Sequence, residues 1–397
     1  MENIMMLNSN VEVPHFIKYM GSKKKIINFV VEAINEVNTS GPVCDLFAGS
    51  SVLSGVLRNQ TNMISNDIQA YSAVLAKAYL TNYNWNSHPS LIQDIISSAS
   101  KKANKFLKTF PKLQFDYERE FTVEEFVSLE EGQQQLIHHD FSLFDYHLFV
   151  KNYSGTYWSY NQCVWIDAFR ATAEEYRETP FYNAILASLM FAMSYNSQST
   201  GHYAQYRDAT NQSSMEDILI YRRKEITPYF VRKMEELRET LGENRYSFDT
   251  HSLDYRDCLD LLPKNTVVYA DPPYAFVHYS RFYHAIETLV RYDYPDVRHK
   301  GRYRNDRHQS PFCIKTQVHN AFHELFCKIS NRDANLVLSY SNTGMIDLDD
   351  LIALANSTLG KRYKIEVNTI DYVHSTMGRR DDKSRNVQEA LITARRL

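Results

Sequence analysis

The stretch Val267-Val268-Tyr269-Ala270-Asp271-Pro272-Pro273-Tyr274 decides how this chain folds. Its first four residues form an apolar run, which predicts a buried strand. Two prolines then end that strand, because proline can neither continue a ladder of hydrogen bonds nor donate one. The side chain of Asp271 and the carbonyls beside it therefore face whatever lies beyond the edge of the sheet. Such a strand end can form a reactive edge, that is, a chemical site at the edge of the sheet. An ordinary strand-ending turn would show the same sequence pattern.

Composition limits the possible classes of protein. The chain has 397 residues, 44% of them hydrophobic and 13% aromatic, which suffices for one enlarged α/β domain or for two or three domains. A formal net charge of −3 disfavours a general polyanion binder, although local basic patches can still bind nucleic acid. The five cysteines are odd in number and form no Cys-x-x-Cys pair, which favours reduced thiols over a zinc or redox site.

Hydropathy gives no sign of a membrane or export segment. No apolar run approaches the length needed to span a bilayer, and the first ten residues lack a basic region followed by a long apolar stretch. We therefore expect a cytoplasmic protein with no membrane partner and no metal.

A second apolar run, Val43 to Leu46, leads into the small-residue turn Phe47-Ala48-Gly49-Ser50-Ser51 and then a helix. Strand, turn and helix make the first half of a Rossmann-like unit, in which a nucleotide-like ligand lies over the carboxyl end of the strand. The turn has only one glycine and is not Gly-x-Gly-x-x-Gly. Without the other glycines the backbone cannot approach a pyrophosphate closely, which argues against a bound dinucleotide and against a nicotinamide dehydrogenase.

Two further segments belong with this unit. The turn Gly21-Ser22 precedes three lysines and a helical pattern, which makes Ser22 the predicted N-cap of that helix. The free backbone N–H groups at the start of the helix could bind an anion or a carboxylate. The alternative is a capped helix whose basic first turn is simply solvated. Met63 to Asp67 predicts a strand that ends in an acid about 20 residues after the turn, where such folds bind ribose hydroxyls. Asp67 could also cap the helix that follows, and the two roles could coexist.

Between about residues 82 and 246 the strand-turn-helix rhythm disappears, which indicates an inserted helical domain. In it, an acid-rich segment at 118–131 predicts the solvated face of a helix, and basic residues around Arg222 are either phosphate contacts or another solvated face. Thr227-Pro228 predicts the cap and first turn of an amphipathic helix. A polar loop containing Asn196 and Gln198 either follows a DNA groove or is an ordinary connection.

The α/β pattern returns after residue 246, with strands expected at 334–340, 364–372 and 387–394. A polar, hairpin-like connection at 378–382 is expected between the last two. The segment after Tyr274 is rich in Tyr and Phe and ends in the strongest basic patch of the chain. A loop beside a reactive edge is well placed to contact a phosphate backbone, so the candidate DNA contacts here are Arg298, Lys300, Arg302 and Arg304.

Four motifs in this order, with a long insertion before the last, resemble the Dam-like (alpha motif order) family of DNA N6-adenine methyltransferases. They are Lys18-Tyr19-Met20-Gly21-Ser22-Lys23, Asp45-Leu46-Phe47-Ala48-Gly49-Ser50, Asn66-Asp67-Ile68 and Asp271-Pro272-Pro273-Tyr274. The match covers the first 80 residues and everything after about 245. The insertion matches no family pattern, and in this family it carries target recognition, so the DNA sequence recognised is left open.

The resemblance implies a Rossmann-like class I methyltransferase fold, α/β with a mixed seven-stranded sheet. It implies a catalytic domain at 1–84 and 245–397 and an inserted, mainly helical target-recognition domain at 85–244. It also implies S-adenosylmethionine as methyl donor, with Asp67 at its ribose and either Asp254 or Asp257 at its adenine; Asp254 is our choice. The implied donor-binding residues are Tyr19, Gly21, Ser22, Lys23, Asp45, Phe47, Ala48, Gly49, Ser50, Asp67, Ile68 and Asp254.

The chemistry of the strand-ending turn agrees with methylation of an exocyclic amino group. Such a nitrogen is a poor nucleophile, and acceptors for both of its N–H groups make its lone pair more available for attack on a sulfonium methyl. The Asp271 carboxylate and the Pro272 carbonyl are two such acceptors, held by Pro273. An adenine inside a duplex must be flipped out, and Tyr274 predicts the aromatic face that receives it.

We therefore expect a site-specific adenine methyltransferase acting on double-stranded DNA, the modification half of a restriction-modification system with a separately encoded endonuclease. Cytosine-amino or RNA-adenine methylation would use similar edge chemistry, and the acid at position 271 favours adenine. A non-enzymatic DNA-binding protein built on a methyltransferase fold is the alternative from another class.

Overall fold

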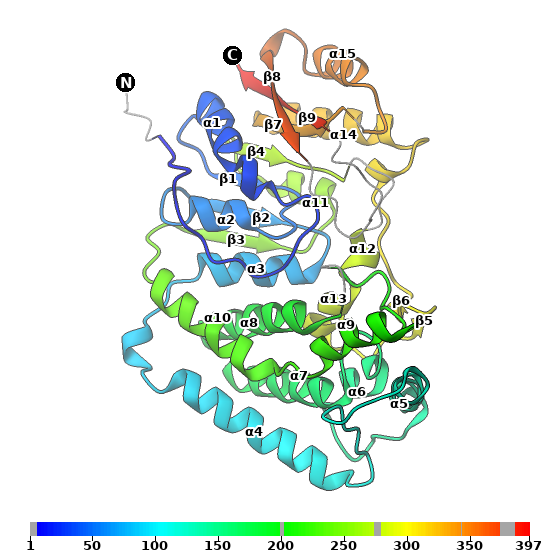
Figure 1. Cartoon of the computed structure of the whole chain (residues 1–397). Coiled ribbons are helices and arrows are strands. Elements are labelled where there is room, and N and C mark those ends of the chain that lie inside the picture. The colour runs from blue at the N-terminus through cyan, green and yellow to red at the C-terminus, as the bar shows by residue number, and fades with distance from the viewer. Residues whose placement is uncertain (1–5, 199–201, 274–278, 343, 374–385) are drawn as a thin grey trace.

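The computed structural model describes residues 6–198, 202–273, 279–342, 344–373 and 386–397. A seven-stranded sheet in the order β3-β2-β1-β4-β7-β9-β8 occupies its upper part (Figure 1). β9 pairs antiparallel with β7 and β8, while the remaining neighbours pair in parallel. This confirms the predicted mixed sheet. Its strands are β1 (Val43–Asp45), β2 (Met63–Asn66), β3 (Phe248–His251), β4 (Val267–Ala270), β7 (Asn335–Ser341), β8 (Tyr363–Val373) and β9 (Asn386–Arg396).

Helices cover both faces of the sheet because the central strands are apolar on both sides. Val43 and Val267 point into a cluster with one set of helices, and Cys44 and Val268 into a cluster with another. The first set is α1 (Ile27–Val37), α2 (Val52–Leu57) and α3 (Ala70–Leu80); the second is α11 (Tyr255–Leu261), α14 (Val318–Asn331) and α15 (Leu348–Leu359).

Between α3 and β3 the described residues form helices and no named strand. These helices lie below the sheet in Figure 1, and their main apolar cluster is continuous with that of α1 to α3. An insertion of helices is therefore present, but it shares a core with the sheet, and the boundaries 85 and 244 stay a prediction. The helices are α4 (Leu91–Thr109), α5 (Val123–Gln134), α6 (Leu148–Tyr153), α7 (Tyr160–Ala173), α8 (Phe181–Asn196), α9 (Gln212–Arg222) and α10 (Ile226–Thr240).

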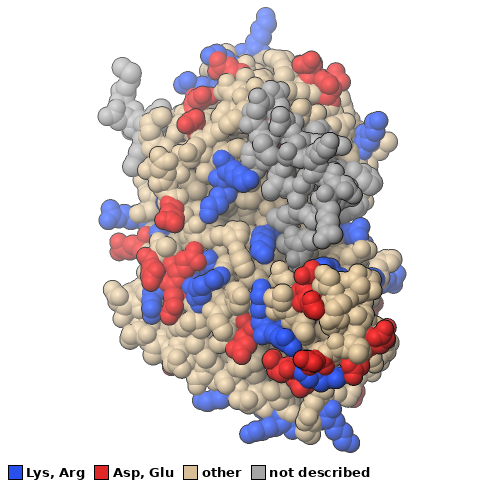
Figure 2. All heavy atoms as spheres, in the orientation of Figure 1, with Lys and Arg blue, Asp and Glu red and all other residues tan. Residues whose placement is uncertain are grey.

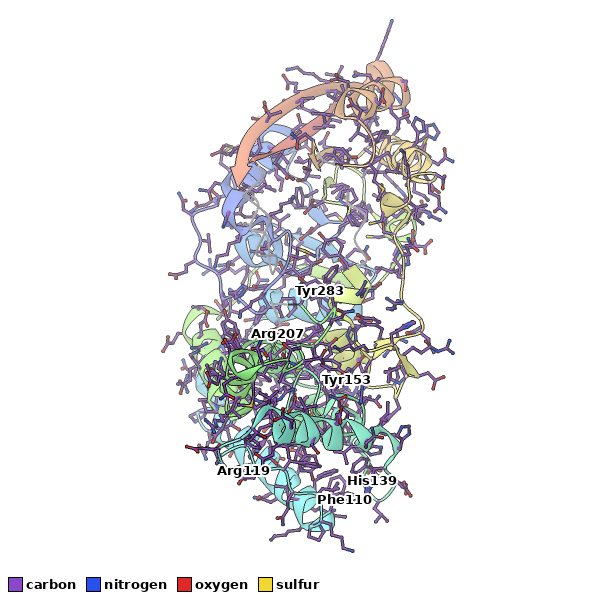
Figure 3. The ribbon with its side chains drawn as sticks, turned by 45° about the vertical axis from the view of Figure 1, so that its right-hand side comes forward. Phe110, Arg119, His139, Tyr153, Arg207 and Tyr283 are labelled. Atoms are coloured by element: carbon purple, nitrogen blue, oxygen red, sulfur yellow. The ribbon has the colours of Figure 1, made fainter. Side chains whose placement is uncertain are left out.

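A later segment of the chain joins this helical body. It comprises α12 (Tyr279–Phe282), α13 (His284–Arg291) and the hairpin of β5 (Val297–Arg298) with β6 (Tyr303–Arg304). The Tyr157 hydroxyl donates to the Gly301 carbonyl at 3.0 Å, and Arg302 donates to the Asn152 carbonyl at 2.6 Å. Figure 3 shows Tyr283 where the two parts of the molecule meet and Tyr153 among the helices. The sequence assigned this segment to the catalytic domain by position alone.

Two sequence interpretations of the helical body were wrong. Glu130 was placed on a solvated face, yet it is buried and accepts hydrogen bonds from the buried Arg222 and from the Tyr117 hydroxyl. A buried charge requires such a partner, and the partner lies 92 residues away in the chain. The helix expected to begin with a Thr227 cap begins at Ile226 instead.

The predicted closing strands are confirmed as β8 and β9, and their connection at 378–382 lies outside the described residues. Among the helices that the structure describes, none combines the length and apolarity needed to cross a bilayer.

Candidate functional site

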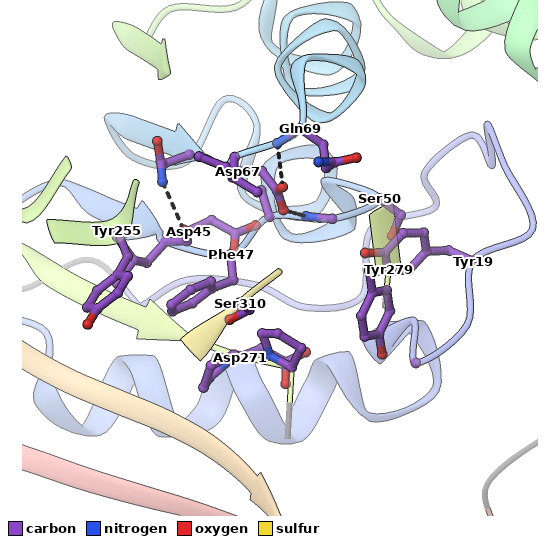
Figure 4. Close-up of a pocket in the computed structure, with 18 of the residues that line it drawn as sticks. Tyr19, Asp45, Phe47, Ser50, Asp67, Gln69, Tyr255, Asp271, Tyr279 and Ser310 are labelled. Atoms are coloured by element: carbon purple, nitrogen blue, oxygen red, sulfur yellow. Dashed lines mark hydrogen bonds between the residues drawn. The ribbon is translucent and has the colours of Figure 1, made fainter. Parts of the chain in front are cut away.

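A cavity of about 1220 Å³, including its open mouth, lies over the carboxyl ends of β1, β2 and β4 (Figure 4). Ligands of open α/β sheets bind at this edge, because the loops that leave parallel strands all emerge there. All twelve residues that the resemblance implied for donor binding line this cavity, together with Asp271, Pro272 and Pro273. Segments at residues 19–23, 45–50, 67–68, 254 and 271–273 are thus brought together in space.

The turn after β1 is shaped by its one glycine. Gly49 has φ +52°, in the left-handed region where a side chain is disfavoured, and an added Cβ would lie 2.8 Å from the Tyr19 Oη. The Tyr19 ring is stacked on Tyr283 with centroids 4.7 Å apart. Glycine at position 49 therefore allows the turn to lie against the Tyr19 ring. This contact explains the glycine without a bound pyrophosphate.

Asp67, which follows β2, fixes this turn from the side. One carboxylate oxygen accepts from the Gly49 N–H at 2.9 Å and the other from the Gln69 N–H at 2.9 Å (Figure 4). The second bond lies just before α3, so Asp67 supports the entry of that helix although Gln69 occupies its cap position. Burial raises the pKa of Asp67, and the backbone donors oppose that shift.

Ser22 and Lys23 form the opposite rim. Ser22 caps the short helix η1 (Lys23–Ile26) and accepts from the Lys24 N–H, as the sequence predicts. Lys23 Nζ lies 3.2 Å from Asp271 Oδ1 and 2.5 Å from Glu389 Oε1. One lysine thus pairs with an acid at the end of β4 and with a buried acid of β9.

This arrangement sets the charge state of Asp271. Burial raises the pKa of Asp271 to about 6; Lys23 lowers it, and the neighbouring Glu389 raises it again. Asp271 is therefore mainly ionised at neutral pH and can accept hydrogen bonds. Sequence reasoning missed Glu389, because it lies 366 residues from Lys23 and no motif marks it.

Asp254 and Asp257 differ in position. Asp254 lines the cavity and caps α11, accepting from the Arg256 N–H at 3.0 Å. Asp257 lies in the first turn of α11 and is not among the cavity-lining residues. The geometry thus supports the choice of Asp254.

Tyr269 is a further lining residue that the motif search overlooked. It is 3% exposed, and its hydroxyl is a buried polar atom with no hydrogen-bond partner in the described part of the chain. A signal existed, because residues two apart in a strand point to the same side, which places Tyr269 beside Asp271. Buried polar groups are rarely left unpaired, so this hydroxyl suits a ligand.

Five of the six predicted DNA contacts, Asn196, Gln198, Lys300, Arg302 and Arg304, have partners within the protein; this argues against free donors there, and their contact with DNA stays a prediction. The side chains of Asn196 and Gln198 are buried and donate to backbone carbonyls. Arg302 donates to two backbone carbonyls, and Arg304 is 3% exposed and paired with Asp293 and Asp306. In the folded protein these side chains therefore form hydrogen bonds or ion pairs with other parts of the chain.

The remaining predictions have different outcomes. Arg298 is exposed, and Lys300 is exposed and pairs with Asp208. Tyr274, predicted to stack on the flipped base, lies outside the described residues. Figure 2 shows acidic and basic side chains interspersed among the described residues of the face in view, and these residues form no single extended basic surface there.

The strand order, the reversed β9 and the position of the cavity together define a Rossmann-like methyltransferase fold. A model of the family described as D12 class N6 adenine-specific DNA methyltransferase matches residues 19–351. The chain belongs to this family, which confirms the resemblance carried by its four motifs.

Curated relatives are similar at low identity. Modification methylase LlaI of Lactococcus lactis subsp. lactis is 24% identical over 390 residues, 94% of this chain and 54% of that protein. Type II methyltransferase M.FokI of Planomicrobium okeanokoites is 24% identical over 88% of this chain and 48% of its own length. Type II methyltransferase M.NlaIII of Neisseria lactamica is 24% identical, and the match covers 83% of this chain and 85% of that protein. The chain thus spans about half the length of the first two relatives.

Proposed function

We propose that this protein transfers the methyl group of S-adenosylmethionine to the N6 amino group of a flipped-out adenine in double-stranded DNA. The observation that carries the proposal is the Asp271 carboxylate, paired with Lys23 and followed by Pro272, in the wall of the same cavity that the donor-turn residues line. The names of the relatives, a modification methylase and a type II methyltransferase, support a modification enzyme of a restriction-modification system. A cytoplasmic location and a separate endonuclease partner are further parts of the proposal.

The residues of the cavity fit such a donor. Four carboxylates line it, Asp45, Asp67, Asp254 and Asp271, and Lys23 is already paired with Asp271 and with Glu389, which suits a ligand with net positive charge. Burial, Asp271 and Asp67 raise the pKa of Asp45, and a bound cation would oppose that effect. When bound, S-adenosylmethionine supplies a methyl group activated by its sulfonium.

Several of the lining residues would hold the donor. Asp67 and the Gly49 turn would hold its ribose, and Asp254 with the Phe47 ring would contact its adenine. Asp45, Ser50 and the Tyr269 hydroxyl would bind its amino-acid end, beside Tyr19. The other donor-binding residues in this proposal are Gly21, Ser22, Ala48 and Ile68.

The protein residues at the strand end prepare the nucleophile. The Asp271 carboxylate and the Pro272 carbonyl accept hydrogen bonds from the two N–H groups of the target amino group, which raises electron density on its nitrogen. The nitrogen would form its new bond to the methyl carbon that the donor would supply, and the sulfur-carbon bond would break. The amino group then loses one proton, which the Asp271 carboxylate can take.

Delivery of the base uses the rest of the chain. Flipping costs a few kcal/mol of unstacking, and Tyr274 is the proposed stacking face. The helical body at 85–244 is the proposed target-recognition domain, beside the catalytic domain at 1–84 and 245–397.

The decisive experiment is a labelled-methyl assay on mixed-sequence DNA and RNA duplexes and single strands, followed by nucleoside analysis. We expect the label in N6-methyl-2'-deoxyadenosine from duplex DNA. Label in RNA or on a cytosine would change the substrate that we assign, but not the proposed role of Asp271 and Pro272 in activating an amino group. Donor binding without any transfer to nucleic acid would contradict the proposal.

Variants of Asp271 test the mechanism itself. Asp271→Asn, which preserves side-chain size, and Asp271→Ala should each lower the transfer rate by about 10³-fold or more, because the amide cannot serve as a second N–H acceptor of equal strength. Calorimetry should show donor binding retained in both. Retained turnover in either variant would remove Asp271 from the mechanism.

A further inference from the structure

A second hollow shares a wall with the donor cavity. It offers about 590 Å³, open to solvent, and is lined by Gln205, Arg281, Arg307 and the hairpin residues His299, Lys300, Gly301 and Tyr303. The short helix α12 contributes to both spaces, because Tyr279 and Ser280 line the donor cavity whereas Arg281 lines the hollow. The Ser280 hydroxyl donates to the His308 carbonyl at 2.7 Å, which joins two residues of the donor cavity whose chain neighbours, Arg281 and Arg307, line the hollow.

Two arginines converge on one aromatic ring in the hollow. The guanidinium carbons of Arg281 and Arg307 lie 5.3 and 5.0 Å from the centre of the Tyr303 ring. Arg281 Nε donates to the Tyr303 hydroxyl at 3.1 Å, and Arg307 Nε donates to the Arg304 carbonyl at 3.1 Å. These acceptors are neutral, and neither arginine forms an ion pair with any acid that the structure describes.

The ring that supports these arginines is itself held in place. Tyr303 is 5% exposed and makes an edge contact with the buried His284 ring, with centroids 5.0 Å apart. A Cβ at Gly301 would lie 2.3 Å from the Tyr303 ring, so glycine there permits the ring to lie against the turn of the hairpin. The two guanidinium groups are therefore positioned before any ligand arrives.

The neighbouring cations behave differently. Arg304 is buried in contact with two aspartates, Arg302 is bound to backbone carbonyls, and Lys300 pairs with Asp208. Arg281 and Arg307 thus leave positive charge uncompensated in a concave surface. Planar guanidinium groups favour a phosphate, which they can bind through two parallel hydrogen bonds.

We propose that Arg281 and Arg307 bind a backbone phosphate of the DNA strand beside the flipped nucleotide. The inference rests on the proposed function, since the shared wall places this phosphate next to the cavity that would receive the base. A phosphate held here would fix the register of the strand, as phosphate contacts do, without reading its sequence. Neither arginine belongs to any motif of the chain.

The test is the salt dependence of DNA binding. Affinities for a mixed-sequence duplex are measured at several salt concentrations, with S-adenosylhomocysteine present so that no transfer occurs. The proteins are the wild type, Arg281→Gln, Arg307→Gln and the double variant. Arg245→Gln is the matched control, because Arg245 is an exposed arginine that lines neither the donor cavity nor the hollow.

The double variant should bind DNA at least about tenfold more weakly, since charge-assisted hydrogen bonds are lost, and its log-log salt slope should fall by about one. Binding of S-adenosylhomocysteine should be unchanged, which shows that the fold is intact. An Arg281→Lys, Arg307→Lys variant should keep the wild-type slope while losing part of the affinity.

Two outcomes separate the proposals. A wild type that binds and methylates DNA, with a double variant that keeps its slope and affinity, overturns the phosphate site alone. A wild type that neither binds nor methylates DNA overturns the proposed function and this inference together.

Discussion

The donor cavity and the helical body show how differently two parts of one chain can be predicted. Around the cavity, the residues that meet are grouped in short motifs, each tied to a strand end that the topology places at one edge. In the helical body, charged residues expected on the surface instead pair internally across long stretches of chain, as Glu130 does with Arg222. Motif residues are set by local geometry, whereas a buried ion pair is set by a partner that no local pattern reveals.

The largest expected effect tests this difference in the helical body. Arg222→Met should lower the free energy of unfolding by about 3–5 kcal/mol, because it leaves Glu130 buried without its cation. If the two side chains lay on solvated faces instead, the loss would be about 1 kcal/mol or less. Urea unfolding measures the change, with Lys364→Met as control, since Lys364 and its partner Glu366 are both exposed.

The double variant Arg222→Met, Glu130→Leu sharpens the result. It should recover much of the lost stability, because it removes the uncompensated charge along with its partner. A single variant that unfolds at the wild-type urea midpoint would show that the pair contributes nothing.

The sequence predicted features that depend on a few neighbouring residues, and it did not predict contacts between residues distant in the chain. The strand that ends at Asp271, the glycine turn and the acid after β2 could be predicted, because periodicity and turn residues act over a few positions. Glu389 could not, since its contact with Lys23 depends on the pairing of β9 beside β7. The hairpin at 297–304 was noticed for its charge, but its packing against Tyr157 and Asn152 decides which of its arginines stay exposed.

The next effect concerns the glycine turn of the cavity. Gly49→Ala should cost about 1–2 kcal/mol from the left-handed backbone alone, and more from the clash with Tyr19. Donor affinity should fall by about tenfold or more for the same reasons. Calorimetry with S-adenosylhomocysteine and urea unfolding provide the two measurements.

Two other glycines separate the causes. Gly360 also has positive φ (+64°), but nothing lies within 4 Å of an added Cβ, so Gly360→Ala reports backbone strain without a clash. Gly242→Ala meets neither condition and should be silent. If Gly49→Ala merely matched Gly360→Ala in stability and bound donor normally, the close approach of Tyr19 would have no functional weight.

The smallest expected effect is a shift in the pH profile of methyl transfer. The pKa of Asp271 is raised to about 6, so activity that requires its ionised form should fall as pH drops through about 6. Glu389→Gln removes a carboxylate that raises this pKa and leaves Lys23 to Asp271 alone. The acidic limb should therefore move to lower pH, with little change in rate at pH 8.

The free energy of unfolding should also depend on pH through Asp271, and the shift of its pKa on folding fixes the direction of that dependence. Because the folded-state pKa of Asp271 lies above its usual value of 3.8, the stability that its protonated form contributes is fully present below about pH 3.8, falls as the pH rises to about 6, and stays lost above that. Asp271→Asn should therefore stabilise the protein more at pH 7.5 than at pH 4. Glu366→Gln, an exposed acid on β8, is the control for both profiles. An acidic limb that stays in place in Glu389→Gln would mean that Lys23 and burial alone set the charge of Asp271, and that β9 has no part in the chemistry.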